Sequence, residues 1–129
     1  MEEKLSRVGP IRRYGDLLVY QQAYRLALAV SQMSKTFPKH EQYELGRQIR
    51  SSSRSVAANI VERWAKRESA AEFKRHLQIA IGECEETRFW LDLATDEGCV
   101  ATLKSDAIRS EYAKLGMMIR NLWQEWRKL

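Results

Sequence analysis

The sequence predicts an all-α protein, an antiparallel up-down-up-down four-helix bundle. In four long segments, apolar residues recur at alternating spacings of three and four, as they do along one face of a helix. The chain of 129 residues has only two prolines and six glycines, which leaves little material for turns. Long helices joined by short connections favour antiparallel neighbours, and this length suits one domain.

We interpret residues 1–15 as an N-terminal arm, which can be disordered alone, and residues 16–129 as the bundle domain. The arm contains a Gly-Pro pair and scattered charges without a clear period. Asp16 can cap the first helix, and Pro38 ends it because the residue before a proline is disfavoured in a helix. The predicted core face of this helix comprises Val19, Ala23, Leu26, Val30, Met33 and Phe37.

The second helix is predicted to begin around Lys39 to Glu41 and to end near Lys66. Small residues are frequent between positions 51 and 58. We interpret them as a place where helices approach closely rather than as a functional serine cluster. The predicted core stripe comprises Leu45, Ile49, Ser52, Val56 and Ile60.

A capping box formed by Ser69 and Glu72 predicts the start of the third helix, and Gly98 predicts its end. The core face of this helix is predicted to comprise Phe73, Leu77, Ala80, Ile81, Cys84 and Leu91. Either Thr102 or Ser105 can cap the fourth helix. Its predicted core face comprises Ile108, Tyr112, Leu115, Ile119, Leu122 and Trp126.

The first and third helices each carry a second apolar face. An outer helix of a monomer needs only one such face, so these surfaces predict self-association, with closed cyclic symmetry as the expected form. Two alternatives remain open: scattered exposed hydrophobic residues, or an irregular bundle that buries these helices on two sides. The predicted oligomer-interface residues are Leu17, Tyr20, Tyr24 and Leu28 on the first helix, and Ile79, Trp90 and Leu93 on the third.

Charge is segregated along the chain. Residues 39–67 carry seven Lys/Arg against three Glu, a net +4, and residues 68–98 carry three Lys/Arg against eight Asp/Glu, a net −5. A basic face suits polyanions, although a solvated face that pairs with the acidic third helix of a neighbouring copy is an equal alternative. The predicted nucleic-acid-binding residues are Arg47, Arg50 and Arg54, which should point outward together, with Arg63, Lys66, Arg67, Arg12 and Arg13.

No catalytic constellation is expected, and no metal or cofactor. The two histidines, His40 and His76, fall on different elements, and Glu72 with His76 is only a fragment of a di-iron pattern. Cys84 and Cys99 have no ligand spacing. With no signal peptide and no long apolar run, we expect a soluble, cytoplasmic protein that is not an enzyme and does not contact a membrane.

Ordered motifs along the chain match the pattern of one family. They are DLLVYQQA at 16–23, FPK at 37–39, LGRQIRSSSRS at 45–55, NIVER at 59–63, EFKRHLQIAIG at 72–82 and LDLA at 91–94. On these motifs the chain resembles the four-helix-bundle proteins encoded by intervening sequences of 23S ribosomal RNA genes. That family is related to the accessory variability determinant (Avd) proteins of diversity-generating retroelements. At Arg63 the family tends to have glycine.

The resemblance implies a ring-like homo-oligomer, commonly a pentamer, and no catalytic residues or cofactors. In the retroelement branch it also implies a basic surface that binds nucleic acid and a reverse transcriptase. We therefore expect a non-catalytic, oligomeric protein that binds RNA or DNA, with a reverse transcriptase as a further candidate partner. The alternative is a protein-interaction scaffold of the ribosomal intervening-sequence type, which binds a partner protein through Tyr20, Tyr24 and Trp90. The sequence leaves the choice between the two branches open.

Overall fold

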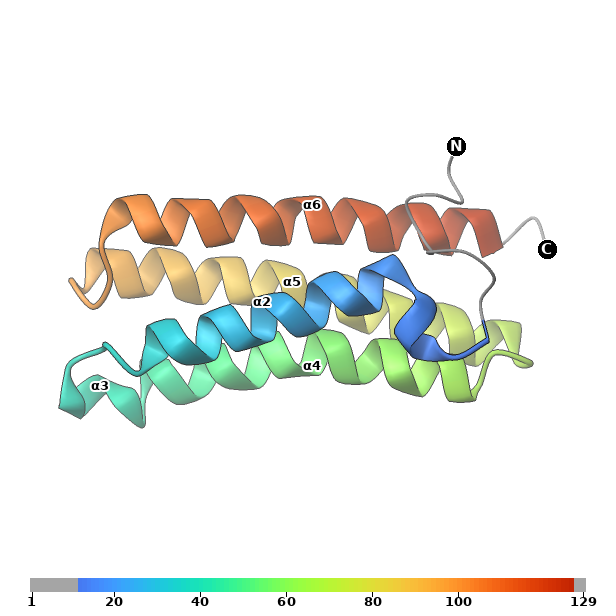
Figure 1. Ribbon diagram of the computed structural model, residues 1–129, viewed down its shortest axis with the longest axis horizontal. Coiled ribbons are helices and arrows are strands. Elements are labelled where there is room, and N and C mark those ends of the chain that lie inside the picture. Colours follow the sequence, from blue (N-terminus) through green and yellow to red (C-terminus); the bar gives the residue numbers. More distant parts are fainter. Residues whose placement is uncertain (1–11, 127–129) are drawn as a thin grey trace.

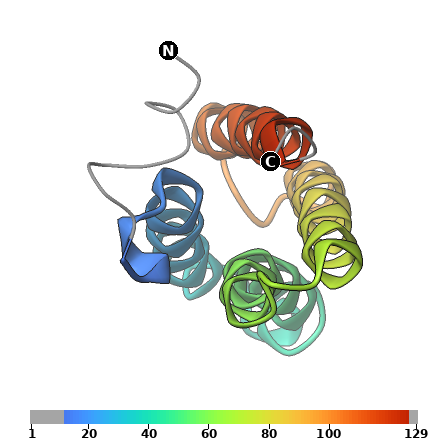
Figure 2. The ribbon, with the colours of Figure 1, turned by 90° about the vertical axis from the view of Figure 1, so that its right-hand side faces the viewer.

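The computed structural model describes residues 12–126, which fold into four long helices packed side by side (Figure 1). The elements are the 3-10 turn η1 (Tyr14–Asp16), α2 (Leu18–Ser34), the short α3 (Lys39–Gln42), α4 (Leu45–Ala65), α5 (Ala70–Asp96) and α6 (Thr102–Trp126). Viewed along the bundle, α2, α4, α5 and α6 follow one another around the core, with α6 beside α2 (Figure 2). The predicted up-down-up-down bundle is confirmed.

The core is built from the predicted stripes. Every residue predicted for the core faces of α2 and α4 is buried, as are all those predicted for α5 except Ile81, which is half-buried. In α6 the predicted face is buried from Ile108 to Leu122, and the side chain of Trp126 lies outside the described residues. Burial of these apolar stripes is the main favourable term in folding, so the periodicity of the sequence specifies how each helix is rotated.

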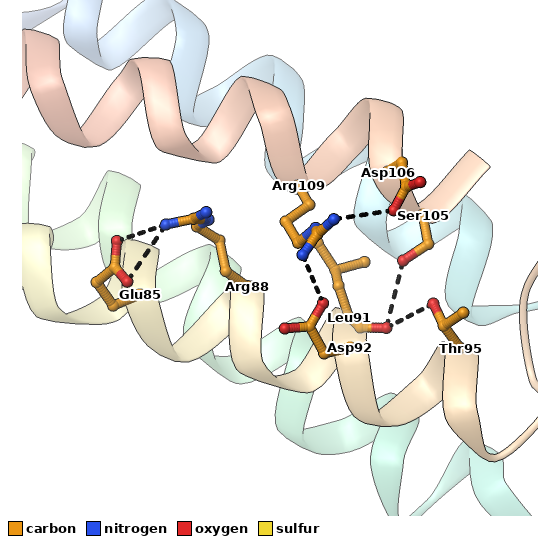
Figure 3. A network of polar contacts seen from close by, with 8 residues as sticks. All are labelled: Glu85, Arg88, Leu91, Asp92, Thr95, Ser105, Asp106 and Arg109. Atoms are coloured by element: carbon orange, nitrogen blue, oxygen red, sulfur yellow. Dashed lines mark hydrogen bonds and ion pairs between the residues drawn. The ribbon is translucent and has the colours of Figure 1, made fainter. Parts of the chain in front are cut away.

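Polar contacts, both exposed and buried, join α5 to α6 (Figure 3). Arg109 of α6 forms ion pairs with Asp92 of α5 and with Asp106 of its own helix, each at 3.1 Å. The hydroxyl of the buried Ser105 donates to the Leu91 carbonyl oxygen at 3.3 Å. α6 begins at Thr102, and the first backbone hydrogen bond of the helix runs from the Ser105 N–H to the Ala101 carbonyl oxygen. The residue before the helix is therefore Ala101, and the prediction that Thr102 or Ser105 caps it is wrong.

The start of the first long helix also differs from expectation. Asp16 lies in η1, where its carboxylate accepts hydrogen bonds from the backbone N–H groups of Arg12 at 2.9 Å and Arg13 at 3.2 Å. The residue that precedes α2 is Leu17, and no side chain caps this helix. Asp16 therefore stabilises the turn before α2 rather than α2 itself. Residues 1–11, most of the predicted arm, lie outside the described residues.

The predicted second helix is divided into α3 and α4. The chain leaves the helical path at Tyr43 and Glu44, and α4 begins at Leu45. Ser69 accepts a hydrogen bond from the Glu72 N–H at 3.4 Å, which confirms it as the cap of α5. None of the helices in residues 12–126 is long and apolar enough to cross a bilayer.

Two glycines allow a matched test of the α5 stop. Gly98 follows α5 with φ of +77°, a conformation that costs other residues about 1 kcal/mol. Gly82 lies inside α5, and a Cβ there would meet no atom within 4 Å. We expect Gly98→Ala to lower the free energy of unfolding by about 1 kcal/mol and Gly82→Ala to raise it by about 0.5–1 kcal/mol. Urea denaturation measures both, and a shift in the same direction would contradict the assignment.

Candidate nucleic-acid interface

The predicted basic residues separate into two groups along α4. Arg47 lies in the first turn of α4 and Arg54 near its middle, both exposed. Lys66 and Arg67 follow the other end of the helix, about 28 Å from Arg47 at 1.5 Å per residue, and are also exposed. Because α2 is antiparallel to α4, η1 and the exposed Arg12 and Arg13 before it lie at that same end (Figure 1). We call Arg12, Arg13, Lys66 and Arg67 the cationic end.

Arg50 does not join Arg47 and Arg54 on the outer face. Its guanidinium turns back along the bundle, where Nη1 donates to Ser34 Oγ at 3.0 Å and Nη2 donates to the Gln42 carbonyl oxygen at 2.9 Å. It thereby ties α4 to α2 and to the end of α3. The prediction that the three arginines point outward together is wrong, because the break between α3 and α4 leaves carbonyl oxygens that Arg50 reaches.

Arg63 was expected on the surface and is buried, with 1% of its area exposed. It lies three residues after Ile60, so it continues the core stripe of α4. Its guanidinium carbon is 4.2 Å from the ring centroid of Phe73 and 5.9 Å from that of Trp64. A cation over aromatic faces gains electrostatic attraction from the rings, and this contact replaces the water that a surface arginine would have.

No carboxylate in residues 12–126 forms an ion pair with Arg63, and its Nε has no hydrogen-bond partner there. Burial, together with the smaller effect of the nearby charge of Arg67, lowers the pKa of Arg63 to about 10. The side chain still carries its proton at neutral pH. The bundle therefore holds an uncompensated positive charge just beneath the cationic end.

Arg67 is held against Trp64, a contact that sequence reasoning missed. The Arg67 guanidinium carbon is 4.5 Å from the Trp64 ring centroid, and Nη1 donates to the Trp64 carbonyl oxygen at 2.9 Å. Lys66 lies 3.9 Å from Glu62 in an exposed pair, which contributes little stability. The sequence does place Trp64 among basic residues. Aromatic and basic side chains together are typical of nucleic-acid-binding surfaces, so this pattern could have predicted the contact.

Part of the acidic charge of α5 is already paired within the subunit. Glu85 contacts Arg88 at 3.0 Å and Asp92 contacts Arg109 at 3.1 Å (Figure 3). Carboxylates engaged in this way are less able to neutralise the arginines of a neighbouring copy. This weakens the alternative in which the basic face serves only to pair with an acidic third helix.

The second apolar face of the first helix loses one predicted member. Leu17 is 1% exposed and belongs to the core, because it precedes α2 in an extended conformation and the helical period does not apply to it. Tyr20 is half-buried, with its ring 4.9 Å from that of Tyr14 and 5.9 Å from that of Tyr24. Tyr24 and Leu28 are each 53% exposed, so they remain available to a partner.

On α5, Ile79 is 37% exposed, whereas Trp90 and Leu93 are half-buried and pack against the core. Phe89 was not predicted, yet it is 56% exposed and its ring lies 4.9 Å from that of Trp90. Phe89 lies two residues before the core residue Leu91, which is about 200° around the helix. This spacing could have predicted that Phe89 faces away from the core. α5 therefore has an exposed apolar surface, as predicted, but its most exposed residue is Phe89 rather than Trp90 or Leu93.

The groups considered for chemistry have structural contacts. His76 is buried, with Nδ1 3.0 Å from Asn59 Oδ1, and Glu72 binds Arg75 at 3.0 Å. Burial raises the pKa of the Cys84 thiol to about 12, which disfavours its thiolate. Within residues 12–126, no group of three or more potential ligands is placed to hold a metal ion.

The buried charge of Arg63 gives a stability prediction. Desolvation of an ion costs several kcal/mol, more than the roughly 2 kcal/mol of a favourable cation–π contact. We expect Arg63→Met to raise the free energy of unfolding by about 1 kcal/mol or more in urea denaturation. The exposed control, Arg67→Met, should change it by less than about 0.5 kcal/mol. A loss of stability in Arg63→Met would show that the aromatic contacts outweigh desolvation.

Comparison with known proteins agrees with this architecture. Residues 15–121 match the family model described as 23S rRNA-intervening sequence protein. A crystal structure of a protein with unknown function from the S23 ribosomal protein family of Bacteroides thetaiotaomicron VPI-5482 has the same fold. Its TM-score is 0.76 at 22% identity, over 83% of this chain and 96% of that one. No curated protein matches the chain. The protein belongs to the 23S rRNA-intervening sequence protein family.

Proposed function

We propose that this protein is a non-catalytic, oligomeric nucleic-acid-binding protein whose cationic end contacts phosphates. The observation that carries the proposal is that exposed Arg12, Arg13, Lys66 and Arg67 lie at one end of the bundle, where η1 contacts α4. The same end holds the buried Arg63, which has no carboxylate partner among residues 12–126. Guanidinium groups suit phosphate oxygens because they donate in pairs. Lys66 is paired with Glu62, whereas Arg63 and Arg67 have no carboxylate partner among residues 12–126. Positive charge left without a partner in this way favours a polyanionic ligand.

Self-association is part of the proposal. The exposed Tyr24 and Leu28 on α2, together with Phe89 on α5, are large apolar groups of the kind buried at association surfaces. A closed ring would repeat the cationic end in every subunit and so raise the local positive potential. The pentamer is proposed from the family resemblance of the sequence, and so is a reverse transcriptase as a further partner.

Salt-dependent binding tests the phosphate contacts. The variant R12A/R13A/K66A/R67A should lose more than about tenfold in affinity for RNA or DNA at roughly 0.1 M salt. The slope of log affinity against log salt should become shallower by about 0.7 per lost contact on a single strand, or about 0.9 on a duplex. The comparison variant R47A/R54A removes exposed cations from the rest of α4 and should lose less. Absence of binding by the unmodified protein at low salt would contradict the proposal, as would an unchanged slope.

The interface can be tested by mass in solution. The double variant Tyr24→Glu/Leu28→Glu places charge on the exposed face of α2 and should shift light scattering toward the monomer mass of 15.1 kDa. Tyr43→Glu is the matched control, since Tyr43 is 70% exposed in the break between α3 and α4. An unmodified protein that stays at 15.1 kDa at high concentration would contradict self-association.

The second candidate function is a protein-interaction scaffold, which the exposed aromatic residues Tyr24 and Phe89 favour. The two functions differ in their dependence on nucleic acid. A partner protein captured from the native cell extract and retained after nuclease treatment supports the scaffold. A partner released by nuclease supports binding through RNA or DNA.

A further inference from the structure

A continuous chain of cation–π contacts runs from the core to the surface at the cationic end. It begins at the buried Phe73, passes through the Arg63 guanidinium at 4.2 Å, and reaches the Trp64 ring at 5.9 Å. It ends at Arg67, whose guanidinium lies 4.5 Å from the Trp64 ring centroid and whose side chain is exposed. Flat aromatic and guanidinium groups follow one another, and the last of them faces water.

Two contacts with Trp64 hold the exposed Arg67 side chain in place. Its guanidinium is supported by the half-buried Trp64 ring, and Nη1 is fixed by the hydrogen bond of 2.9 Å to the Trp64 carbonyl oxygen. No carboxylate in the described part of the chain forms an ion pair with it. A planar group held in this way loses little conformational freedom when another planar group stacks on it.

We propose that Arg67 stacks on an unpaired base of a single-stranded nucleic acid, while the adjacent Lys66 contacts the backbone phosphate. This inference rests on the proposed function and specifies its ligand as single-stranded. Bases stack on arginine guanidinium planes as well as on aromatic rings, and stacking tolerates any base because every base has a π face. In a duplex these faces are covered by neighbouring base pairs, so only an unpaired base can continue the chain of contacts.

The charge beneath this surface supports the same ligand. Arg63 is buried and has no carboxylate partner among the described residues, so the field of its charge is screened less than that of an exposed arginine. Phosphates that flank the stacked base would enter this field. Neutralising such a phosphate with Lys66 releases counterions, whereas stacking on Arg67 does not depend on the phosphate. The two contributions can therefore be separated by removing the bases while the phosphates stay in place.

The test compares two ligands of equal length by fluorescence anisotropy: a single strand and the same strand with abasic sugars. The intact protein should bind the single strand about tenfold more tightly than the abasic strand, in keeping with the contribution of one stacked base. Arg67→Lys keeps the charge and removes the plane, so this ratio should fall to near one while abasic binding is retained. Arg120→Lys is the matched control on α6, where Arg120 is exposed, and should preserve the ratio.

Each outcome bears on the stacking proposal. An intact protein that binds single and abasic strands equally overturns it while leaving phosphate binding in place, and so does a tenfold ratio that survives in Arg67→Lys. No binding of any ligand at low salt overturns the proposed function and the stacking with it. DNA and RNA versions of the strands distinguish the source of the base, and a loss of the ratio in Arg67→Lys with either sugar supports the proposal. Circular dichroism confirms that each variant keeps its helices.

Discussion

The bundle must bury a guanidinium, because the core-facing stripe of α4 ends in Arg63. Phe73 and Trp64 accept this charge on their ring faces, and no described carboxylate forms an ion pair with it. We expect this charge to lower the stability of the subunit. It also adds positive charge to one end of the bundle, where no carboxylate of residues 12–126 pairs with Arg63. The exposed Arg67 extends that positive charge into water. The polarity of the surface is thus coupled to the packing of the core.

Most of the fold could be predicted from the sequence, because one strong constraint decides it. A helix in a small bundle buries one stripe, and the spacings from Val19 to Phe37 and from Leu45 to Ile60 leave little choice of rotation. The cap at Ser69 and the stop at Gly98 were predictable for a different reason. A hydroxyl that satisfies a free N–H and a residue free to adopt positive φ are local requirements that depend little on the rest of the structure.

The candidate site was less predictable, because its residues depend on contacts that no period records. Leu17 lies just before α2, so helical spacing assigned its side chain to the wrong side. Arg50 donates hydrogen bonds to Ser34 and Gln42. The bond to Gln42 crosses the interruption between α3 and α4, which the apolar pattern did not show. The position of Arg63 on the core stripe was visible in the spacing, but its charge suggested the surface. The charge of Arg63 predicted an exposed side chain, whereas its helical spacing from Ile60 predicts the buried position that the structure has.

The family match and the fold shared with the Bacteroides protein agree with the four-helix bundle. We propose that nucleic acid binds at the end carrying Arg63, Lys66 and Arg67. Side-chain NMR of the arginine Nε–Hε groups during titration with a single-stranded oligonucleotide tests it most directly. We predict a saturable shift of the Arg67 signal, with the Arg47 signal at the other end of α4 changing least. A shift centred on Arg47, with Arg67 unmoved, would contradict it.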